Sequence, residues 1–345
     1  MGTSNNKDKY GFLFKDVKEY NKYLLTLVCC SILVLTGIIS YMVTNSYAKW
    51  SSSYVSNNII KLSVKSGMDA TEFATKTVGT DGLEQITHTI DNTLQVDNKF
   101  ATEYRYRGGD SVVKNYVIFN NETWRIIGVI PTEDTNGKVE NRIKIVKDTS
   151  IENKKWNENG INDWTTATLN TYLNNDYYNT LTTDAKNMIG TAKYYLGGYN
   201  NNPSFTSDVM WQYERKNEAN RTGYYCGTNP IMQNDTTKKI AIMYASDYGY
   251  AASKECTSNL YDYDGSASCK TTNNWLDKSA YTWLLPQNSD VSYLAFYVYS
   301  SGFVSNYYDV RKGEYAVRPV LYLSSNVKIS GGEGTSEQPY QLSIS

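Results

Sequence analysis

The sequence NYVIFNNETWRIIGVI, residues 115–130, contains two apolar runs separated by a short polar turn. Residues 116–119 and 124–130 are rich in Val, Ile, Phe and Trp, which favour β-strands. Asn120 and Asn121 lie close to the break between the runs, and asparagine tolerates the backbone conformations of tight turns. The stretch therefore predicts two neighbouring antiparallel strands, and the rest of the fold is built outward from this hairpin.

Further strand patterns lie on both sides of the hairpin. Residues 104–109 (YRYRGG) alternate Tyr with Arg, and residues 142–148 (RIKIVKD) alternate Ile and Val with charged residues. Such alternation is typical of strands with one buried face, so these segments and the hairpin predict a meander of three or four strands. More strands are expected in the C-terminal part, at residues 239–245 (KIAIMYA), 283–285 (WLL), 292–304 (SYLAFYVYSSGFV), 315–323 (YAVRPVLYL), 326–330 (NVKIS) and 340–344 (YQLSI).

Two helices are expected between these groups of strands, because apolar residues recur there at helical spacing behind polar capping residues. The first apolar stripe consists of Leu169, Tyr172, Leu173 and Tyr177, and the second consists of Ala185, Met188, Ile189 and Ala192. Helices grouped between two sets of strands favour an α+β fold over alternating βαβ units. We therefore expect one α+β domain over residues 101–345, with a strand-rich body and two central helices.

Residues 23–48 form an uncharged run of 26 residues, of which eleven are Leu, Ile or Val. At about 1.5 Å per residue, a helix of this length exceeds the roughly 30 Å hydrocarbon thickness of a bilayer. Residues 1–22 carry five Lys against three acidic residues, a flank that stays cytoplasmic. A single transmembrane signal-anchor with an extracellular C-terminal domain is expected. Because residues 46–48 (SYA) form a small-x-small site, a cleaved secretory signal is the alternative.

Residues 49–100, between the predicted anchor and the predicted domain, are rich in Ser, Asn, Thr and Asp. One short helix is expected there, opened by Asp69 and carrying Ala70, Phe73 and Ala74 on one side. This composition predicts a stalk or linker that holds the main domain away from the membrane.

The amino-acid composition argues against nucleic acid as a partner and favours sugars or proteins. The chain has 345 residues and a formal net charge of −1, without the clustered basic face that nucleic-acid binding requires. It contains 32 Tyr, 7 Trp and 8 Phe, and tyrosine combines a rigid apolar ring with a hydroxyl, which suits recognition of sugars or proteins. Codon bias in an AT-rich genome is the alternative source of the tyrosines. A binding role without nucleic acid is therefore expected.

The five cysteines fall into two groups. Cys29 and Cys30 lie inside the predicted membrane span, whereas Cys226, Cys256 and Cys269 lie in the predicted extracellular part, where a disulfide can persist. Three thiols allow three bridges, and Cys256 with Cys269 is the favoured pair because the residues between them are polar and turn-rich. No metal site is expected, since the chain has no CxxC motif and a single histidine.

Catalytic signatures are weak in this sequence. His88, the single histidine, falls in the predicted linker, so Ser/His and Cys/His catalysis are not expected. Ser325 and Lys328 match SxxK without an accompanying KTG. Asp262 and Asp264 could act as a carboxylate pair in glycosidic chemistry, but their context, YDYDGS, is typical of a turn and lacks the other ligands of a calcium loop. We therefore expect a protein that is not an enzyme and has no cofactor.

Several phrases in order resemble an uncharacterised family of single-pass surface proteins of low-GC Gram-positive bacteria, especially gut species. They are NYVIFNNETWRIIGV, TLNTYLNNDYYNTL, TTDAKNMIG, SDYGYA, NNWL and AVRPVLYLSSNVKISGGEGTSEQPYQL, together with Cys256 and Cys269. The resemblance runs from about residue 104 to the C-terminus and implies an extracellular domain of unknown function. More distantly, the domain resembles the C-type-lectin and formylglycine-generating-enzyme-like fold, without the EPN, QPD or WND motifs of calcium-dependent sugar-binding lectins.

These features together predict a membrane-anchored surface binding protein, an adhesin for glycan or protein ligands. The alternatives are a structural component of the envelope and a wall-glycan hydrolase acting through carboxylates. Aromatic rings can stack on pyranose rings, so the candidate ligand contacts are aromatic residues in two loop-like regions. They are Trp211 and Tyr213 in the irregular segment at residues 197–239, and Tyr297, Tyr299, Phe303, Tyr307 and Tyr308 around the bend at residues 300–309.

Overall fold

The computed structural model describes residues 67–94, 96–134, 136–200, 205–215, 231–232 and 239–345, together with Asn21 and Thr36. Residues Met1–Lys65 and Ser66–Ser345 form two separate contact units, and the description below concerns the second. The predicted membrane span at residues 23–48 lies outside the described residues, apart from Thr36. Among the described residues, no helix is both long enough and apolar enough to cross a bilayer.

The hairpin expected at residues 115–130 is present. Strand β3 (Tyr116–Phe119) pairs antiparallel with β4 (Glu122–Glu133), with Phe119 opposite Glu122. Asn120 and Asn121 both have positive φ, 56° and 58°, as a type I′ turn requires. The asparagine pair therefore fixes the register of the hairpin.

The hairpin belongs to a six-stranded antiparallel sheet in the order β1-β2-β4-β5-β13, with β3 paired to β4. Its other strands are β1 (Leu83–Thr87), β2 (Thr102–Tyr106), β5 (Val139–Lys147) and β13 (Val320–Tyr322). Gly128 on β4 permits the close approach of β2, because a Cβ there would lie 2.0 Å from the carbonyl oxygen of Tyr104. The predicted meander is thus the centre of a larger sheet.

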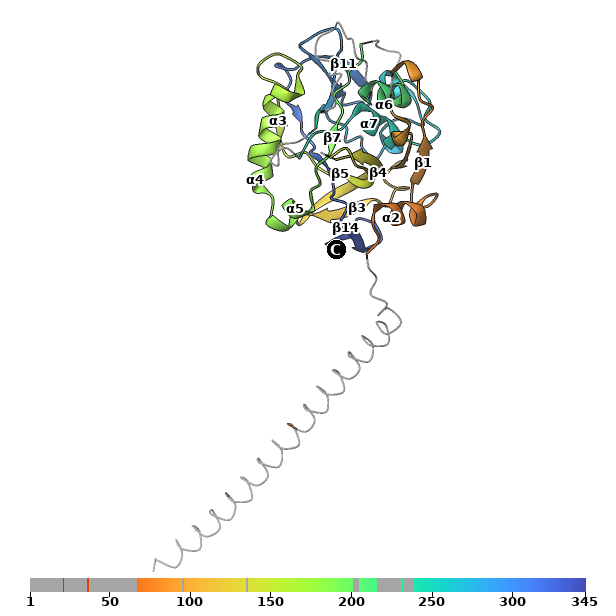
Figure 1. The fold of residues 1–345 in the computed structure, drawn as a ribbon, viewed down its shortest axis with the longest axis vertical. Helices are drawn as coiled ribbons and strands as arrows, with labels where there is room; N and C mark the ends of the chain where they lie inside the picture. Colours follow the sequence, from red (N-terminus) through yellow and green to blue (C-terminus); the bar gives the residue numbers. More distant parts are fainter. Residues whose placement is uncertain are drawn as a thin grey trace, which may run out of the picture. The chain divides into compact units, whose positions relative to one another are not determined.

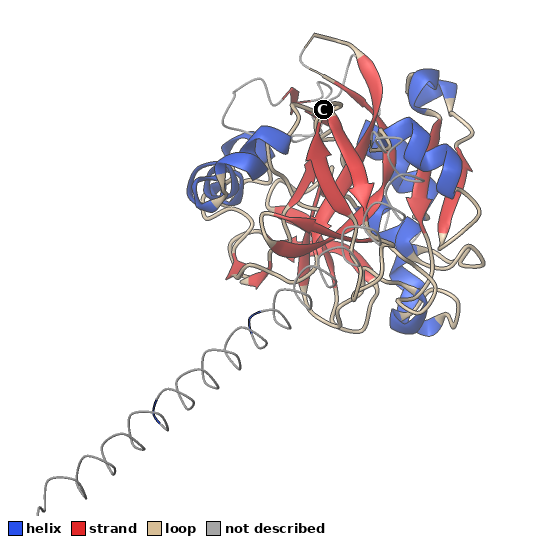
Figure 2. Ribbon diagram, turned by 90° about the horizontal axis from the view of Figure 1, so that it is seen from below, coloured by secondary structure: helices blue, strands red, loops and turns tan. Residues whose placement is uncertain are grey.

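A second sheet has five strands in the order β11-β10-β9-β12-β6. They are β6 (Asn153–Lys154), β9 (Thr282–Gln287), β10 (Leu294–Val298), β11 (Val304–Asp309) and β12 (Tyr315–Ala316). Two small sheets pair β14 (Val327–Gly331) with β15 (Gln341–Ile344) and β7 (Lys193–Tyr194) with β8 (Ile231–Met232). In Figure 2 the strands run through the middle of this unit with helices on both sides.

The single strand expected at residues 315–323 is divided between the two large sheets. Residues 315–316 form β12 and residues 320–322 form β13, with Arg318 and Pro319 at the crossing. The buried Arg318 side chain donates hydrogen bonds to the carbonyl oxygens of Lys147 (3.0 Å) and Leu276 (2.9 Å). This arginine therefore ties β5 and the segment after η6 to the point where the chain passes from one sheet to the other.

The two predicted central helices are present and lie along one side of the unit (Figure 1). The first combines α3 (Thr168–Tyr172), a π-helical segment η4 (Leu173–Tyr177) and α4 (Tyr178–Thr180). The second, α5 (Thr183–Met188), begins at the Thr182 cap and is shorter than expected. Ile189 bridges to Leu323 instead of continuing the helix, which places the end of the predicted stripe in extended backbone.

The segment predicted as a stalk, residues 49–100, is largely part of the folded unit from residue 67 onward. The expected short helix is α2 (Ala70–Thr77), and the Asp69 side chain accepts a hydrogen bond from the backbone N–H of Glu72. Phe73 on α2 and Leu83 on β1 are both fully buried. The polar composition did not predict that this region is folded, because a few apolar residues, spaced to face the core, are sufficient to anchor it.

Two further expectations are wrong: the irregular segment at residues 197–239 and the strand at residues 239–245. Within the irregular stretch lies helix α6 (Ser207–Arg215), and residues 239–245 form a single bridge, from Ala241 to Val320, in place of a strand. The side chain of Asn174 accepts hydrogen bonds from the backbone N–H groups of Lys239 and Ile240, which replaces a strand partner at this point. Helix α7 (Ala245–Ala251) follows directly.

The remaining helical elements are short turns. They are η1 (Asn92–Leu94), η2 (Asn98–Phe100), η3 (Trp164–Thr166), η5 (Leu260–Gly265) and η6 (Thr271–Asn273). The core beneath these elements contains six fully buried tryptophans, Trp124, Trp156, Trp164, Trp211, Trp275 and Trp283. The described architecture is a mixed α+β unit dominated by strands, as the sequence indicates.

Candidate functional site

Eight aromatic side chains gather on the five-stranded sheet and its adjoining loops. We call them the aromatic cluster: Tyr261, Tyr281, Trp283, Tyr297, Tyr299, Phe303, Tyr308 and Tyr315. Strands β9, β10, β11 and β12 each contribute one ring, because cross-strand pairing brings positions far apart in sequence onto one face. Tyr281 precedes β9, Tyr299 and Phe303 flank the turn between β10 and β11, and Tyr261 lies on η5.

The rings of the aromatic cluster form a continuous path. The ring centroids of Tyr308 and Tyr315 are 4.9 Å apart. The centroid of Tyr315 lies 5.0 Å from that of Tyr281, which in turn lies 4.6 Å from that of Tyr299. Tyr299 then stacks on Phe303 at 4.7 Å, and Phe303 lies 5.3 Å from Tyr261. These distances lie in the range of favourable aromatic pairs, so each ring is held by its neighbours.

Burial divides the aromatic cluster into a floor and a surface. Trp283 is fully buried, and Tyr297 retains only 7% of its exposure. The remaining rings are half-buried except Tyr261, which is 39% exposed. A surface of half-exposed rings on buried rings is preorganised for contact, because little side-chain entropy remains to be lost on binding.

Hydrogen bonds between tyrosine hydroxyls join two pairs of residues in the aromatic cluster, Tyr299 with Tyr281 and Tyr315 with Tyr308. A hydrogen bond with Tyr281 raises the pKa of Tyr299, and burial together with a hydrogen bond to Tyr308 raises the pKa of Tyr315. Burial also raises the pKa of Tyr297, although a hydrogen bond with Ser305 opposes the shift. The phenols of Tyr297, Tyr299 and Tyr315 are therefore neutral at physiological pH, and they offer a ligand rings and hydroxyl groups without charge.

Four of the seven residues proposed from sequence belong to the aromatic cluster: Tyr297, Tyr299, Phe303 and Tyr308. Tyr307 is 68% exposed on β11, and no ring contact joins it to another described residue. Tyr213 packs against Tyr199, with centroids 4.5 Å apart. Tyr261, Tyr281, Trp283 and Tyr315 were missed, although the alternation of Tyr281 and Trp283 before and within a strand was a usable signal.

Trp211 is not a surface residue. It lies on α6, is fully buried, and stacks on the imidazole of His88 with centroids 3.7 Å apart. His88 bonds to Glu103 (3.0 Å) and Asp208 (2.8 Å), which fixes the plane on which the indole packs. Trp211 is therefore a core residue that joins α6 to the segment after β1, and the expectation of a ligand contact is withdrawn.

A buried network of charges lies against the six-stranded sheet, and we call it the charge network: Glu103, Arg105, Lys144 and Asp247. Arg105 donates to Glu103 at 2.5 Å and to Asp247 at 2.7 Å, and Lys144 donates to Asp247 at 2.6 Å. Burial lowers the pKa of Lys144 to about 8, opposed by Asp247. Burial alone would raise the pKa of Glu103, but Arg105 and His88 hold it well below its usual range.

The charge network corrects the expectation that strands β2 and β5 each have only one buried face. Arg105 and Lys144 alternate with apolar residues along their strands, yet both are at most 1% exposed. Helix α7 covers this face and supplies Asp247, the partner of both cations. Buried charges persist where they are paired, so the network joins α7 to the sheet and is enclosed by protein.

Glu214 on α6 lies close to this network. Burial raises its pKa to about 7, although Arg215 and hydrogen bonds from Ser246 favour the ionised form. Both the backbone N–H and the hydroxyl of Ser246 donate to this carboxyl group. Glu214 therefore titrates within the physiological range and links α6 to the start of α7.

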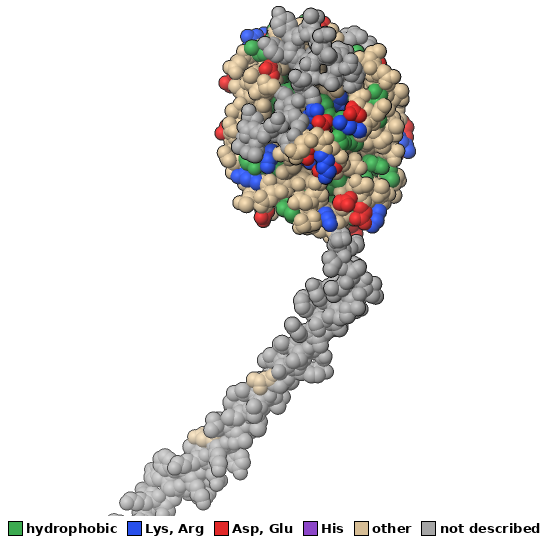
Figure 3. All heavy atoms as spheres, in the orientation of Figure 1, with side chains coloured by type: hydrophobic (Ala, Val, Ile, Leu, Met, Phe, Trp, Pro, Cys, Tyr) green, Lys and Arg blue, Asp and Glu red, His purple; other side chains and the backbone are tan. Residues whose placement is uncertain are grey.

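The acidic pair considered for hydrolysis is not buried. Asp262 and Asp264 are exposed on η5, and Asp264 accepts a hydrogen bond from Ser301. Within the residues that the structure describes, no three His, Cys, Asp or Glu side chains are arranged to hold a metal ion. On the face of the molecule drawn in Figure 3, basic and acidic side chains are interspersed. The described residues on that face therefore form no extended surface of a single charge.

Cys256 and Cys269 are joined in a disulfide, with their Cα atoms 5.0 Å apart. This is the pair expected from the sequence, and Cys226 lies outside the described residues. The bridge closes the loop that carries η5, and η5 places Tyr261 against Phe303. The disulfide thus holds one end of the aromatic cluster in place.

Comparison with curated proteins finds no match, and comparison with solved structures finds none either. Residues 140–325 match the family described as a domain of unknown function (DUF6273). The matched region runs from β5 through β13, and so contains the disulfide and every residue of the aromatic cluster. Because this match covers more than half of the chain, the protein belongs to the DUF6273 family.

Proposed function

We propose that this protein is a cell-surface binding protein whose ligand is a neutral glycan held on the aromatic cluster. Residues 23–48 would anchor the chain in the membrane, with the unit at residues 66–345 outside the cell. The observation that carries the proposal is the aromatic cluster, a path of half-exposed rings supported from below by Trp283 and Tyr297. Contiguous exposed apolar surface of this kind marks interaction sites in soluble domains.

The chemistry of the aromatic cluster fits a sugar better than a charged ligand. The CH faces of pyranose rings pack on aromatic rings, and sugar hydroxyls exchange hydrogen bonds with phenol groups. The hydroxyls of Tyr299, Tyr308 and Tyr315 are at or near this half-exposed surface, and those of Tyr299 and Tyr315 are uncharged. Neutral donors and acceptors beside apolar faces are the groups that a neutral carbohydrate requires.

The likeness to the C-type-lectin and formylglycine-generating-enzyme-like fold is part of this proposal. It rests on a WRI-type strand, paired helices and an expected closing strand ending in VRP (residues 317–319), a sequence that lies between β12 and β13. Fold likeness of this kind carries little weight for function, so the aromatic cluster and not the scaffold supports the choice of ligand.

A glycan array probed with the purified full-length chain tests the binding proposal. Tyr281→Ala removes a half-buried ring from the centre of the cluster, and we expect it to weaken glycan binding about tenfold, as stacking losses do in comparable sites. Tyr307→Ala is the matched control, because Tyr307 is exposed on the same sheet outside the ring path. Absence of any glycan signal, or equal loss in both variants, would contradict the proposal.

Protease treatment of intact cells tests the orientation separately. With tags at both termini, we expect external protease to remove the C-terminal tag and leave the N-terminal tag protected. Release of both tags only after lysis would contradict an external location for residues 66–345.

A further inference from the structure

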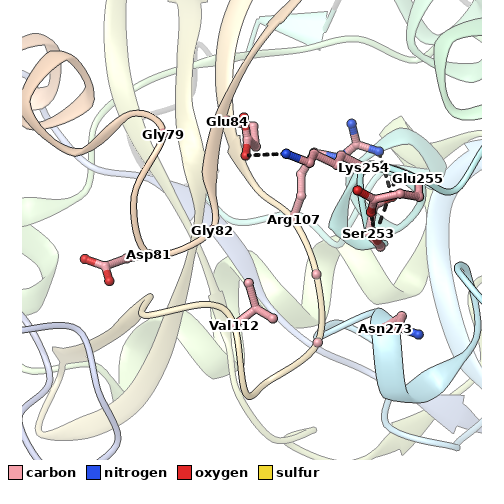
Figure 4. A pocket seen from close by; sticks show the side chains of 12 residues that line it. Gly79, Asp81, Gly82, Glu84, Arg107, Val112, Ser253, Lys254, Glu255 and Asn273 are labelled. Carbon is pink, nitrogen blue, oxygen red and sulfur yellow. Dashed lines mark hydrogen bonds and ion pairs between the residues drawn. The ribbon is translucent and has the colours of Figure 1, made fainter.

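A polar pocket of about 450 Å³ opens beside the edge of the six-stranded sheet (Figure 4). Three segments that are distant in sequence supply most of its walls: the turn into β1, the loop after β2, and the residues after α7. None of the residues that line the pocket belongs to the aromatic cluster. They are Gly79, Asp81, Gly82, Glu84, Arg107, Gly108, Gly109, Val112, Ser253, Lys254, Glu255 and Asn273.

Arg107 brings to this pocket a positive charge without a bonded counterion. Its Nε donates to the carbonyl oxygen of Ala252 at 3.3 Å, and its Nη2 donates to that of Ser253 at 3.0 Å. Among the described residues, no carboxylate lies within ion-pair distance of Arg107. Burial lowers its pKa, opposed in part by the more distant charges of Glu84 and Glu255. The two carbonyl bonds therefore orient the guanidinium without neutralising it.

Carboxylates lie at the same end of the pocket. Glu84 faces Lys254 at 3.9 Å, the outer limit for an ion pair, and Glu255 accepts a hydrogen bond from the hydroxyl of Ser253. That hydrogen bond lowers the pKa of Glu255, so its carboxylate is ionised at neutral pH. Figure 4 shows Glu84, Arg107, Lys254 and Glu255 close together, with Val112 and Asp81 apart from them. One end of the pocket thus carries both signs of charge.

We propose that this pocket binds a small zwitterion, namely a short peptide with free termini. The peptide carboxylate would pair with Arg107 and Lys254, and its ammonium group would pair with Glu84 and Glu255. A simple anion would face the two carboxylates, and a simple cation would face Arg107, so neither satisfies both sets of charges. The volume suits a ligand of this size, and glycine walls leave room for a peptide backbone.

Calorimetric titration of the full-length protein with the dipeptide Ala-Ala tests the proposal. The matched probes are N-acetyl-Ala-Ala, which lacks the ammonium group, and Ala-Ala-amide, which lacks the carboxylate. We expect each capped peptide to bind at least about tenfold more weakly, because each loses a charge-assisted hydrogen bond. No binding of Ala-Ala, or equal affinity for all three peptides, would overturn the proposal.

Two charge-removing variants assign the roles of the two sides. Glu255→Gln should weaken binding of Ala-Ala but not of N-acetyl-Ala-Ala, which has no ammonium group to lose a partner. Arg107→Gln should weaken binding of both of these peptides but not of Ala-Ala-amide, which has no carboxylate. Glu255 is exposed, so this variant should fold normally even if Arg107→Gln does not. Arg311→Gln, an exposed arginine outside the pocket, is the control. Equal losses for free and acetylated peptide in Glu255→Gln would contradict the assignment, whatever the glycan array shows.

Discussion

The charge network and the aromatic cluster use polar side chains in opposite ways. In the charge network, Arg105, Lys144 and Asp247 are fully enclosed, and each charge has a bonded partner of opposite sign. In the aromatic cluster, rings such as Tyr281 and Tyr299 remain half-exposed, and their hydroxyls bond to each other. A closed network contributes to the stability and specificity of the fold, whereas an open cluster leaves surface for a ligand. Loss of one group should therefore have very different effects in the two regions.

The largest effect should follow from removing the shared anion of the charge network. In Asp247→Ala, Arg105 loses one of its two bonded carboxylates, and Lys144 loses the one hydrogen-bond acceptor that it has among the described residues, at sites with no access to water. We expect the free energy of unfolding to fall by about 3 to 5 kcal/mol, as when one partner of a buried pair is removed. Chemical denaturation measures the change. Asp264→Ala, on the exposed surface of η5, should change it by less than about 0.5 kcal/mol.

A smaller effect should follow from opening the disulfide at the edge of the aromatic cluster. The Cys256–Cys269 bridge closes a loop with a sequence separation of 13 residues. A double Cys256→Ser, Cys269→Ser variant should lose about 3 kcal/mol of unfolding free energy, because the unfolded chain regains loop entropy. Reductant should lower the stability of the parent protein by a similar amount and leave the variant unchanged. Equal sensitivity of both proteins to reductant would show that another bond is responsible.

Glu214 should make the free energy of unfolding depend on pH near neutrality, in contrast to groups that stay charged throughout this range. Its pKa is raised to about 7 from an ordinary value of 4.5, so the folded state favours the protonated carboxyl. The contribution is fully present below about pH 4.5 and is lost as pH rises through 7. Between pH 5 and pH 7.5, we expect Glu214 to remove about 2 kcal/mol of unfolding free energy.

The Glu214→Gln variant provides the comparison for this pH effect. Gln cannot ionise, so the difference in stability between variant and parent should grow in favour of the variant from pH 5 to pH 7.5. Denaturant melts at both pH values measure that difference and cancel the background from other titrating groups. Parallel pH profiles would mean that Glu214 has the same pKa in the folded and unfolded chain.

Local signals in the sequence predicted the local parts of the fold. The Asn120–Asn121 turn, the Asp69 cap and the polar loop between Cys256 and Cys269 each depend on residues near one another in the chain. The helical stripe around Leu173 is of the same kind, since it needs only a periodicity. These features could be predicted because the interactions that fix them act within a few residues.

The other features of the fold could not be predicted, because they depend on pairing between residues far apart in the chain. Arg105 and Lys144 follow the alternation of half-solvated strands, and only the arrival of Asp247 from α7 makes their burial possible. The division of residues 315–323 likewise depends on carbonyl partners for Arg318 that lie far away in sequence. Half of the aromatic cluster was missed for the same reason, because the set is defined by the order of strands in the sheet. The sequence predicted individual strands such as β4 and β5 without their neighbours in the sheet.

The smallest effect completes the comparison between the two regions. Tyr299→Phe removes one hydroxyl from the aromatic cluster, where the lost hydrogen bond to Tyr281 can be replaced by water at the half-exposed surface. We expect the free energy of unfolding to change far less than in Asp247→Ala, because neither hydroxyl is left buried without a partner. Denaturation of the two variants side by side measures the ratio. A loss from Tyr299→Phe as large as that from Asp247→Ala would show that the aromatic cluster is a closed part of the core, and would remove the basis for treating it as a binding surface.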